Sequence, residues 1–221
     1  MLWLFFSGLF IWLIFREIYY SVVAPAGFDK PHSPVSIPYI AILTLLAAAF
    51  AYPPVNTWQF ERFLTKQARI LSGSAKASVH CNSVGDTFFD PNVFAAGHAQ
   101  PETGEIVFAH SWCDHLQSHL RNPQKATREG IIGVQIFAHE AMHIRGELDE
   151  AKTECQAIQR YVRTATLLGI PKHIAKKNGM AYYHGEYQAR AQSGQMSAQY
   201  YSNQCAPNKA MDEKLADSIW N

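Results

Sequence analysis

The stretch His139-Glu140-Ala141-Met142-His143 holds the residues of this sequence that are best suited to chemistry. On a helix, residues four apart project from the same face, so the two imidazoles would lie side by side. Two neutral imidazoles can fill two of the four tetrahedral positions around a zinc ion. Glu140 lies about 100° further round the helix, where its carboxylate can reach a water in an open position of the metal. The spacing predicts a Zn²⁺ site with Glu140 as the catalytic general base.

A third metal ligand is expected from the chain that follows these residues. A second helix is predicted after Gly146, a residue that commonly ends helices. If that helix folds back, Glu150 in its first turn can complete the metal site. Glu154, one turn further on, can then accept a hydrogen bond from a ligand imidazole and fix its tautomer. The predicted metal ligands are therefore His139, His143 and Glu150.

The run from His139 to Cys155 resembles the gluzincin pattern, in which H-E-x-x-H is followed by a helix with E-x-x-[A/T]-[D/E]. It is also similar to small actinobacterial-type membrane metallopeptidases, loosely over residues 77–212. The resemblance implies a compact zincin-like domain in which Glu150 binds zinc and Glu154 supports the site. It further implies a peptide or protein substrate, held in extended form along an edge strand around Phe94 to Ala99.

A second alignment of the same residues gives a different third ligand. From His139 through Gly146 to Asp149 the chain also reads H-E-x-x-H-x-x-G-x-x-D, which resembles metzincins that use aspartate as the third ligand. Asn178-Gly179-Met180-Ala181-Tyr182 is compatible with their methionine turn. The helical pattern from Ala151 to Leu168 favours the first alignment, because metzincins leave the helix after that glycine.

The aromatic and polar residues from Tyr182 to Tyr187 could also serve the reaction. A hydrogen-bond donor here could stabilise the oxyanion of a tetrahedral intermediate, and His184 is the candidate. The alternative is that these residues pack a helix with their polar ends at the surface.

The elements that must position these residues follow from the hydrophobic pattern. Apolar residues at helical spacing predict helices over Thr57–Leu71, Trp112–Leu120, Arg128–Arg145, Asp149–Leu168 and Lys172–Gln192. Short apolar runs predict strands over Ala77–Cys81, Val93–Ala99 and Glu105–Ala109, the last two as a hairpin. The fold class is therefore α+β, a mostly helical domain with a small β-sheet that follows two transmembrane helices.

The transmembrane helices are predicted from two long apolar runs near the N-terminus. A membrane helix needs about 20 apolar residues. Leu2 to Val23 reaches that length with one charge pair, and Ile37 to Tyr52 has no charge. We expect Pro53-Pro54 to end the second run, because proline does not continue a helix.

The predicted domains are a transmembrane hairpin over residues 1–54 and the zincin-like metallopeptidase domain over residues 55–221. A secretory signal peptide is the alternative for the first run, because Val-Ala-Pro-Ala near residue 24 resembles a cleavage site. The absence of basic residues at the start and the second apolar run favour two membrane spans.

Four scattered cysteines favour an extracytoplasmic location for the domain. An even number without a C-x-x-C pair is typical of disulfides in an oxidising compartment, whereas buried free thiols are the alternative. Connectivity does not follow from sequence, and we favour Cys81–Cys113 with Cys155–Cys205. The count of basic residues near the spans leans slightly toward the opposite orientation.

The overall charge limits the partners. The net charge is +1 and Lys and Arg form no dense stripe, so no nucleic acid is expected. The predicted function is zinc-dependent peptide-bond hydrolysis by an integral membrane metalloendopeptidase of undetermined oligomeric state. The other possibilities are a metzincin-like peptidase and a catalytically inactive zinc-binding membrane scaffold, although a structural site would not need Glu140.

Overall fold

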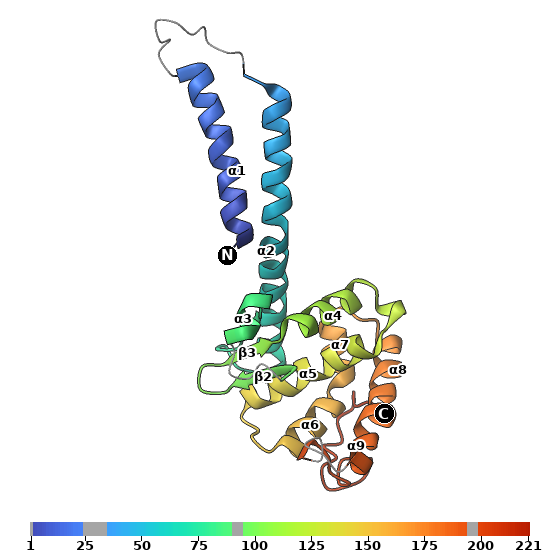
Figure 1. The fold of residues 1–221 in the computed structure, drawn as a ribbon. Helices are drawn as coiled ribbons and strands as arrows, with labels where there is room; N and C mark the ends of the chain where they lie inside the picture. The colour runs from blue at the N-terminus through green and yellow to red at the C-terminus, as the bar shows by residue number, and fades with distance from the viewer. Residues whose placement is uncertain (1, 24–34, 90–94, 194–198) are drawn as a thin grey trace, which may run out of the picture. The chain divides into compact units, whose positions relative to one another are not determined.

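The computed structural model describes residues 2–23, 35–89, 95–193 and 199–221. The chain divides into two compact units, Met1–Gln59 and Phe60–Asn221, and the division falls within the long helix α2 (Figure 1). Each unit is described by itself. The α+β class is confirmed, since helices dominate and three short strands form one sheet.

The first unit is a pair of apolar helices, α1 (Leu2–Ile18), which continues as a π-helical turn (Tyr19–Val23), and the first part of α2 (Ile37–Ser72). The hydroxyl of Ser7 donates to the carbonyl of Ala47 at 3.0 Å, and Phe50 contacts three aromatic rings of α1: Trp3, Phe6 and Phe10. The helices therefore pack side by side.

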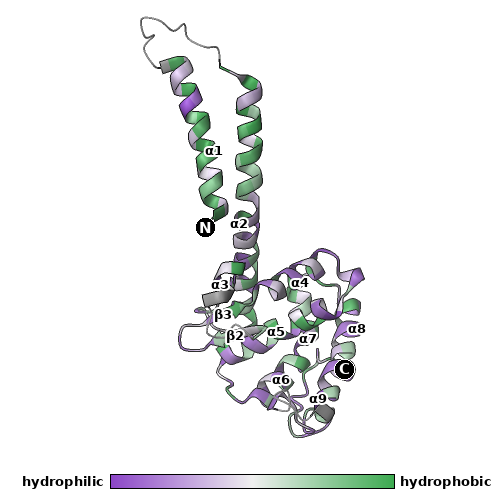
Figure 2. Ribbon diagram, in the orientation of Figure 1, coloured by the Kyte–Doolittle hydropathy of each residue, from purple (hydrophilic) through white to green (hydrophobic). Residues whose placement is uncertain are grey.

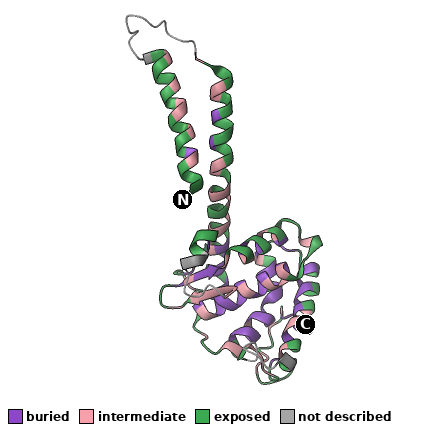
Figure 3. Cartoon of the chain, in the orientation of Figure 1, coloured by how far each residue is buried: buried purple, intermediate pink, exposed green. Residues whose placement is uncertain are grey.

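Most other side chains of this unit are apolar and exposed (Figures 2 and 3). Leu2, Phe5 and Phe15, for example, are 69%, 66% and 67% exposed. Water does not stabilise such a surface, whereas lipid covers it without cost. Both helices are long and apolar enough to cross a membrane.

The prediction that Pro53-Pro54 ends the second apolar run is wrong. Both prolines lie inside α2, which continues to Ser72 and includes the amphipathic helix predicted over Thr57–Leu71. The φ of proline is compatible with a helix, so the cost is two missing amide donors and local crowding. Long helical stretches on both sides of the pair offset that cost.

The second unit contains the sheet, with β1 (Ser78–Cys81), β2 (Gly97–Gln100) and β3 (Glu105–Phe108) in the order β1-β3-β2. The predicted hairpin is confirmed, since β2 runs antiparallel to the central strand β3, and β1 runs parallel to β3. Residues 90–94, where the first hairpin strand was expected to begin, lie outside the described residues.

The two outer edges of the sheet differ. On β1, the amide of Val79 donates to the hydroxyl of Thr65 at 2.9 Å, and the amide of Cys81 donates to the carboxylate of Glu61 at 2.8 Å. Side chains of α2 therefore occupy hydrogen-bonding groups at the edge of β1, as proteins commonly do to protect an edge strand. The edge of β2 faces the candidate site described below.

The helices of this unit pack around α5 (Arg128–Arg145), which contacts α4, α6, α7, α8 and the strands β2 and β3. The others are α3 (Val84–Phe89), α4 (His110–Arg121), α6 (Glu150–Gln159), α7 (Tyr161–Leu167), α8 (Lys172–Tyr182) and α9 (Gln188–Ser193), with a 3-10 turn at Pro123–Lys125 and a π-helical turn at Tyr183–Tyr187. Val134, Phe137, Ala138, Ala141 and Met142 of α5 are fully buried. The His139–His143 motif thus lies on a largely buried helix.

The single helix predicted from Asp149 to about Leu168 is two helices. Its first part ends at Arg160, whose amide donates to the carbonyls of both Gln156 and Ala157 at 3.1 Å. Such shared hydrogen bonds are typical of helix ends. The apolar pattern continues across the break, which is why the sequence does not reveal it.

The predicted disulfides are confirmed. Cys81–Cys113 joins β1 to α4, and Cys155–Cys205 joins α6 to the C-terminal segment. Each closes a loop of tens of residues, which restricts the unfolded chain and so stabilises the folded one.

Candidate metal centre

The site depends on a tight turn between α5 and α6. Gly146 adopts a φ of 111°, in the left-handed region that glycine enters without steric cost. Its amide donates to the carbonyl of His143 at 2.9 Å, and the amide of Glu147 donates to Met142 at 3.2 Å. These bonds satisfy the last carbonyls of α5 and reverse the chain.

The start of α6 is fixed by two carboxylates. Glu147 accepts from the amides of Leu148 and Asp149, both at 3.1 Å. Asp149 caps the helix and accepts from the amide of Lys152 at 2.9 Å. This capping role directs the carboxylate of Asp149 to the backbone of its own helix.

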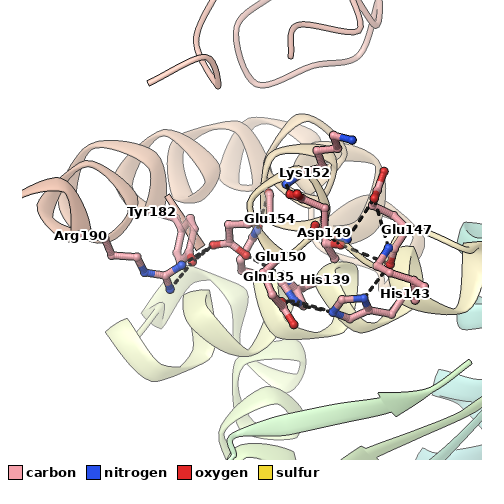
Figure 4. A network of polar contacts seen from close by, with 12 residues as sticks. Gln135, His139, His143, Glu147, Asp149, Glu150, Lys152, Glu154, Tyr182 and Arg190 are labelled. Atoms are coloured by element: carbon pink, nitrogen blue, oxygen red, sulfur yellow. Dashed lines mark hydrogen bonds and ion pairs between the residues drawn. The ribbon is translucent and has the colours of Figure 1, made fainter. Parts of the chain in front are cut away.

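The turn brings three predicted metal ligands together (Figure 4). Nε2 of His139 lies 3.0 Å from Nε2 of His143 and 3.0 Å from Oε2 of Glu150, and the latter two atoms are 3.4 Å apart. In a tetrahedral zinc site with bonds of about 2.0–2.1 Å, ligand atoms are separated by about 3.3 Å. This group could therefore hold a metal ion, and Asp149 is not part of it.

The Nδ1 atom of each imidazole, which points away from the candidate metal position, has a hydrogen-bond acceptor beside it. Nδ1 of His139 lies 2.8 Å from Oε2 of Glu154, and Nδ1 of His143 lies 2.8 Å from the carbonyl oxygen of Glu147. These partners assign the proton of each neutral ring to Nδ1. The Nε2 lone pairs and the Glu150 carboxylate then converge on one point, an arrangement that needs a positive charge at its centre.

The electrostatics of the metal-free site agree with this assignment. Burial alone would lower the pKa of His139, but hydrogen bonds to Glu150 and Glu154 outweigh it and raise the pKa to about 10. The hydrogen bond from His139 lowers the pKa of Glu150. Without a metal, a proton therefore supplies the charge between these groups, and a metal ion must displace it.

Glu140 lies beside this group but does not belong to it. Its side chain is buried, and burial raises the pKa of its carboxyl to about 7, while a hydrogen bond from the backbone of Ala99 acts in the opposite direction. A carboxyl group with a pKa near neutrality is well suited to exchange protons in catalysis.

Glu140 and the three candidate ligands line one pocket of about 310 Å³. The other lining residues come from around β2, from the turn before α6 and from the C-terminal segment: Ala95, Gly97, His98, Ala99, Pro101, Leu148 and Tyr200. The pocket therefore places the possible metal, the possible base and an edge strand together.

The strand β2 lies close against α5 because Gly97 has no side chain. A Cβ atom at this position would lie 2.8 Å from Cγ2 of Ile136 and 3.7 Å from Cγ of Glu140. A side chain here would push the strand away from the helix. The glycine thus sets the distance between the edge strand and Glu140.

Behind the site, Glu154 is held by several donors (Figure 4). It is 2% exposed and accepts from His139, from the phenol of Tyr182 and from the guanidinium of Arg190. Burial alone would raise the pKa of Glu154, but the hydrogen bond and charge of His139 and the charge of Arg190 lower it to about 2. The predicted partner of His139 is thus an ionised, fixed carboxylate.

The predicted oxyanion donor is not in the pocket. His184 is exposed, with Nδ1 3.1 Å from Oε1 of Gln188. Tyr200 lies in the pocket instead, with its ring 5.6 Å from the ring of His139. No sequence pattern indicates Tyr200, because the C-terminal segment is polar and irregular. Met180, proposed for a methionine turn, lies within helix α8.

Comparisons of the chain with protein-family models, with curated proteins and with solved structures found no match. The function must therefore be inferred from the geometry of this site.

Proposed function

We propose that this chain is a zinc metalloendopeptidase anchored in a membrane by α1 and α2. The observation that carries the proposal is the convergence of three lone-pair donors, His139, His143 and Glu150, beside a buried carboxyl group that is not one of them. A zinc site with three protein ligands keeps a position open for water or substrate, which is typical of catalytic rather than structural sites.

The residues divide the chemistry among them. Zinc held by His139, His143 and Glu150 would supply a Lewis acid. Glu140 would accept a proton from the attacking water and later donate it to the leaving amine. Glu154 keeps the imidazole of His139 oriented. In this proposal the phenol of Tyr200, which lines the pocket, takes the role expected of His184 and donates a hydrogen bond to the developing oxyanion.

The substrate is an extended polypeptide that pairs with the edge of β2. Two observations support this: β2 is an outer strand that lines the pocket, and side chains of α2 occupy the opposite edge of the sheet. Main-chain pairing recognises a polypeptide of almost any sequence. Among the described residues, no Lys or Arg lines the pocket, so nothing there selects a terminal carboxylate, which favours cleavage within a chain.

The two disulfides favour an oxidising compartment for this domain, outside the cytoplasm. The membrane anchors favour membrane or envelope proteins as substrates.

The test uses the full chain, purified in detergent and loaded with zinc. Wild-type protein is expected to bind about one zinc per chain and to cleave unstructured polypeptides. Glu140→Gln should keep the zinc and lose turnover by a factor of at least about 100. Glu129→Gln, the same change near the start of α5, is the control and should retain both. If the chain binds zinc but cleaves no polypeptide, it is a zinc-binding scaffold instead. If it binds no metal, both the peptidase and the scaffold are excluded.

A further inference from the structure

Arg190 on α9 makes contacts toward both sides of the candidate metal centre. Nη1 donates to Oε1 of Glu154 at 2.8 Å, and Nη2 donates to the phenol oxygen of Tyr182 at 2.9 Å. The centre of its guanidinium also lies 5.6 Å from the ring of Tyr200. One planar cation thus contacts the carboxylate behind the site and an aromatic ring that lines the pocket.

The first contact connects Arg190 to His139. Oε2 of Glu154 pairs with the imidazole, while Oε1 accepts from Tyr182 and Arg190. Each oxygen thus has a separate partner, so the plane of the carboxylate is fixed and the imidazole plane follows it. A charged donor to a carboxylate that is 2% exposed offsets the cost of burying it. Without Arg190, Glu154 would keep its contact with His139 but lose part of this support.

The second contact connects Arg190 to the pocket. Tyr200 belongs to a segment that is fastened to the domain by the Cys155–Cys205 disulfide and by Tyr187, whose phenol pairs with both the carbonyl and the amide of Ser202 at 3.0 Å. Those anchors fix the segment, and the ring of Tyr200 itself contacts the guanidinium of Arg190 and, at 5.6 Å, the ring of His139. These two contacts restrict the orientation of the ring.

We propose that Arg190 is a positioning residue that couples the orientation of the metal ligand His139 to the placement of Tyr200 in the pocket. Glu154 transmits the coupling to His139, and the cation–π contact of Arg190 transmits it to Tyr200. The zinc site and the substrate pocket are then mechanically linked through a residue that touches neither metal nor substrate. This inference rests on the proposed metal centre, but it concerns the retention and geometry of the metal, which are measurable without peptidase activity.

The first measurement is zinc release from the full chain to an excess of chelator. Arg190→Gln should release zinc about 10- to 100-fold faster, as is typical when support behind a ligand is lost. Tyr200→Leu should release zinc about two- to fivefold faster, because Arg190 loses its cation–π contact with the Tyr200 ring. The double variant should release zinc no faster than Arg190→Gln alone, because both changes break the same link. If the fold increases in zinc release of the two single variants multiply in the double variant, the proposed coupling is overturned.

The second measurement separates positioning from mere stability. With Co²⁺ in place of zinc, the visible absorption bands should shift in Arg190→Gln and return toward wild type in Arg190→Lys, which restores the charge beside Glu154. The control is Arg163→Gln, which removes the two hydrogen bonds from Arg163 on α7 to Asp217 in the C-terminal segment. It should leave the bands and zinc release unchanged. Unchanged absorption bands in Arg190→Gln would overturn the proposal. If zinc release and the Co²⁺ bands change as expected but the wild-type chain cleaves no polypeptide, only the proposed peptidase function is refuted.

Discussion

The two candidate histidine ligands differ in the group that lies behind each imidazole. Both imidazoles have an acceptor at Nδ1, and the two acceptors differ: a carboxylate for His139 and a backbone carbonyl for His143. A carboxylate makes an imidazole a stronger electron donor than a carbonyl does. The two histidines are therefore not equivalent, and loss of Glu154 should weaken metal binding through His139 alone.

At this scale the two alignments of the motif make opposite predictions. Glu150→Gln should weaken zinc binding by more than about 100-fold, beyond the effect typical of groups behind the ligands. Asp149→Asn should change it by less than about twofold, because asparagine is an equally good helix cap. Zinc affinities from competition with a chromogenic chelator would measure both. The reverse pattern would restore the metzincin-like alignment.

The raised pKa of His139 makes zinc binding dependent on pH. Because that pKa is about 10 in the metal-free protein, the ring is protonated near neutral pH, and zinc must displace the proton. Zinc affinity should therefore fall about tenfold for each unit that the pH decreases below about 10. Calorimetry at about pH 8 in buffers of different ionisation enthalpy should find about one proton released per zinc.

Glu140→Gln serves as the background for that titration, since it removes a second group whose proton could be released. Zinc binding with no proton release in this variant would contradict the raised pKa of His139.

The candidate ligands could be predicted from sequence because helical spacing relates His139 to His143 and Glu150 to Glu154, and Gly146 between the two pairs predicts a turn. Tyr200 and Arg190 could not. The segment that carries Tyr200 is held against the domain by the Cys155–Cys205 disulfide and by hydrogen bonds from Tyr183 and Tyr187. No local periodicity in the sequence predicts such contacts. His184 is exposed and does not line the pocket, because the direction of a side chain in the π-helical turn Tyr183–Tyr187 depends on tertiary packing.

At the scale of elements, the approach of β2 to α5 controls the pocket. Gly97→Ala should lower the free energy of unfolding by about 1–3 kcal/mol, because the new methyl group meets a β-branched side chain of α5. If the peptidase proposal holds, KM should also rise, since the edge strand would move away from Glu140. Denaturant unfolding and steady-state kinetics would measure both effects.

Gly185→Ala is the matched control, because a methyl group there meets no atom within 4 Å. Equal effects of the two changes would show that close packing at Gly97 is unimportant.

Element boundaries were less predictable than element types. The helix over α5 and the hairpin of β2 and β3 follow from strong periodicity. The continuation of α2 through Pro53-Pro54 does not, because proline lowers helix stability without forbidding a helix. The break at Arg160 is also hidden, since apolar residues on both sides of it face the same core.

At the scale of the whole molecule, the disulfides have separable roles. Replacing Cys155 and Cys205 by alanine should cost about 2–5 kcal/mol of stability. It should also raise KM, because the segment that carries Tyr200 loses its covalent anchor to α6. Removing Cys81–Cys113, which joins β1 to α4, should cost similar stability and leave KM unchanged. A KM effect of the same size in both pairs would contradict a specific role for the first.

The membrane proposal predicts how the chain fractionates. The protein should stay in the membrane pellet after alkaline carbonate extraction, because two long apolar helices hold it there. Its mass should include the first residues of the sequence. A soluble product that lacks residues up to about Ala26 would favour the signal-peptide alternative.

Glu150 and Glu154 lie one turn apart on α6 and hold opposite nitrogens of the same ring, His139. A small rotation of this helix about its axis therefore displaces both carboxylates together. The affinity for a metal ion and the orientation of the His139 imidazole therefore change together. The connection from Gly146 to Asp149 sets the rotation of α6, so one inserted or deleted residue there would alter both.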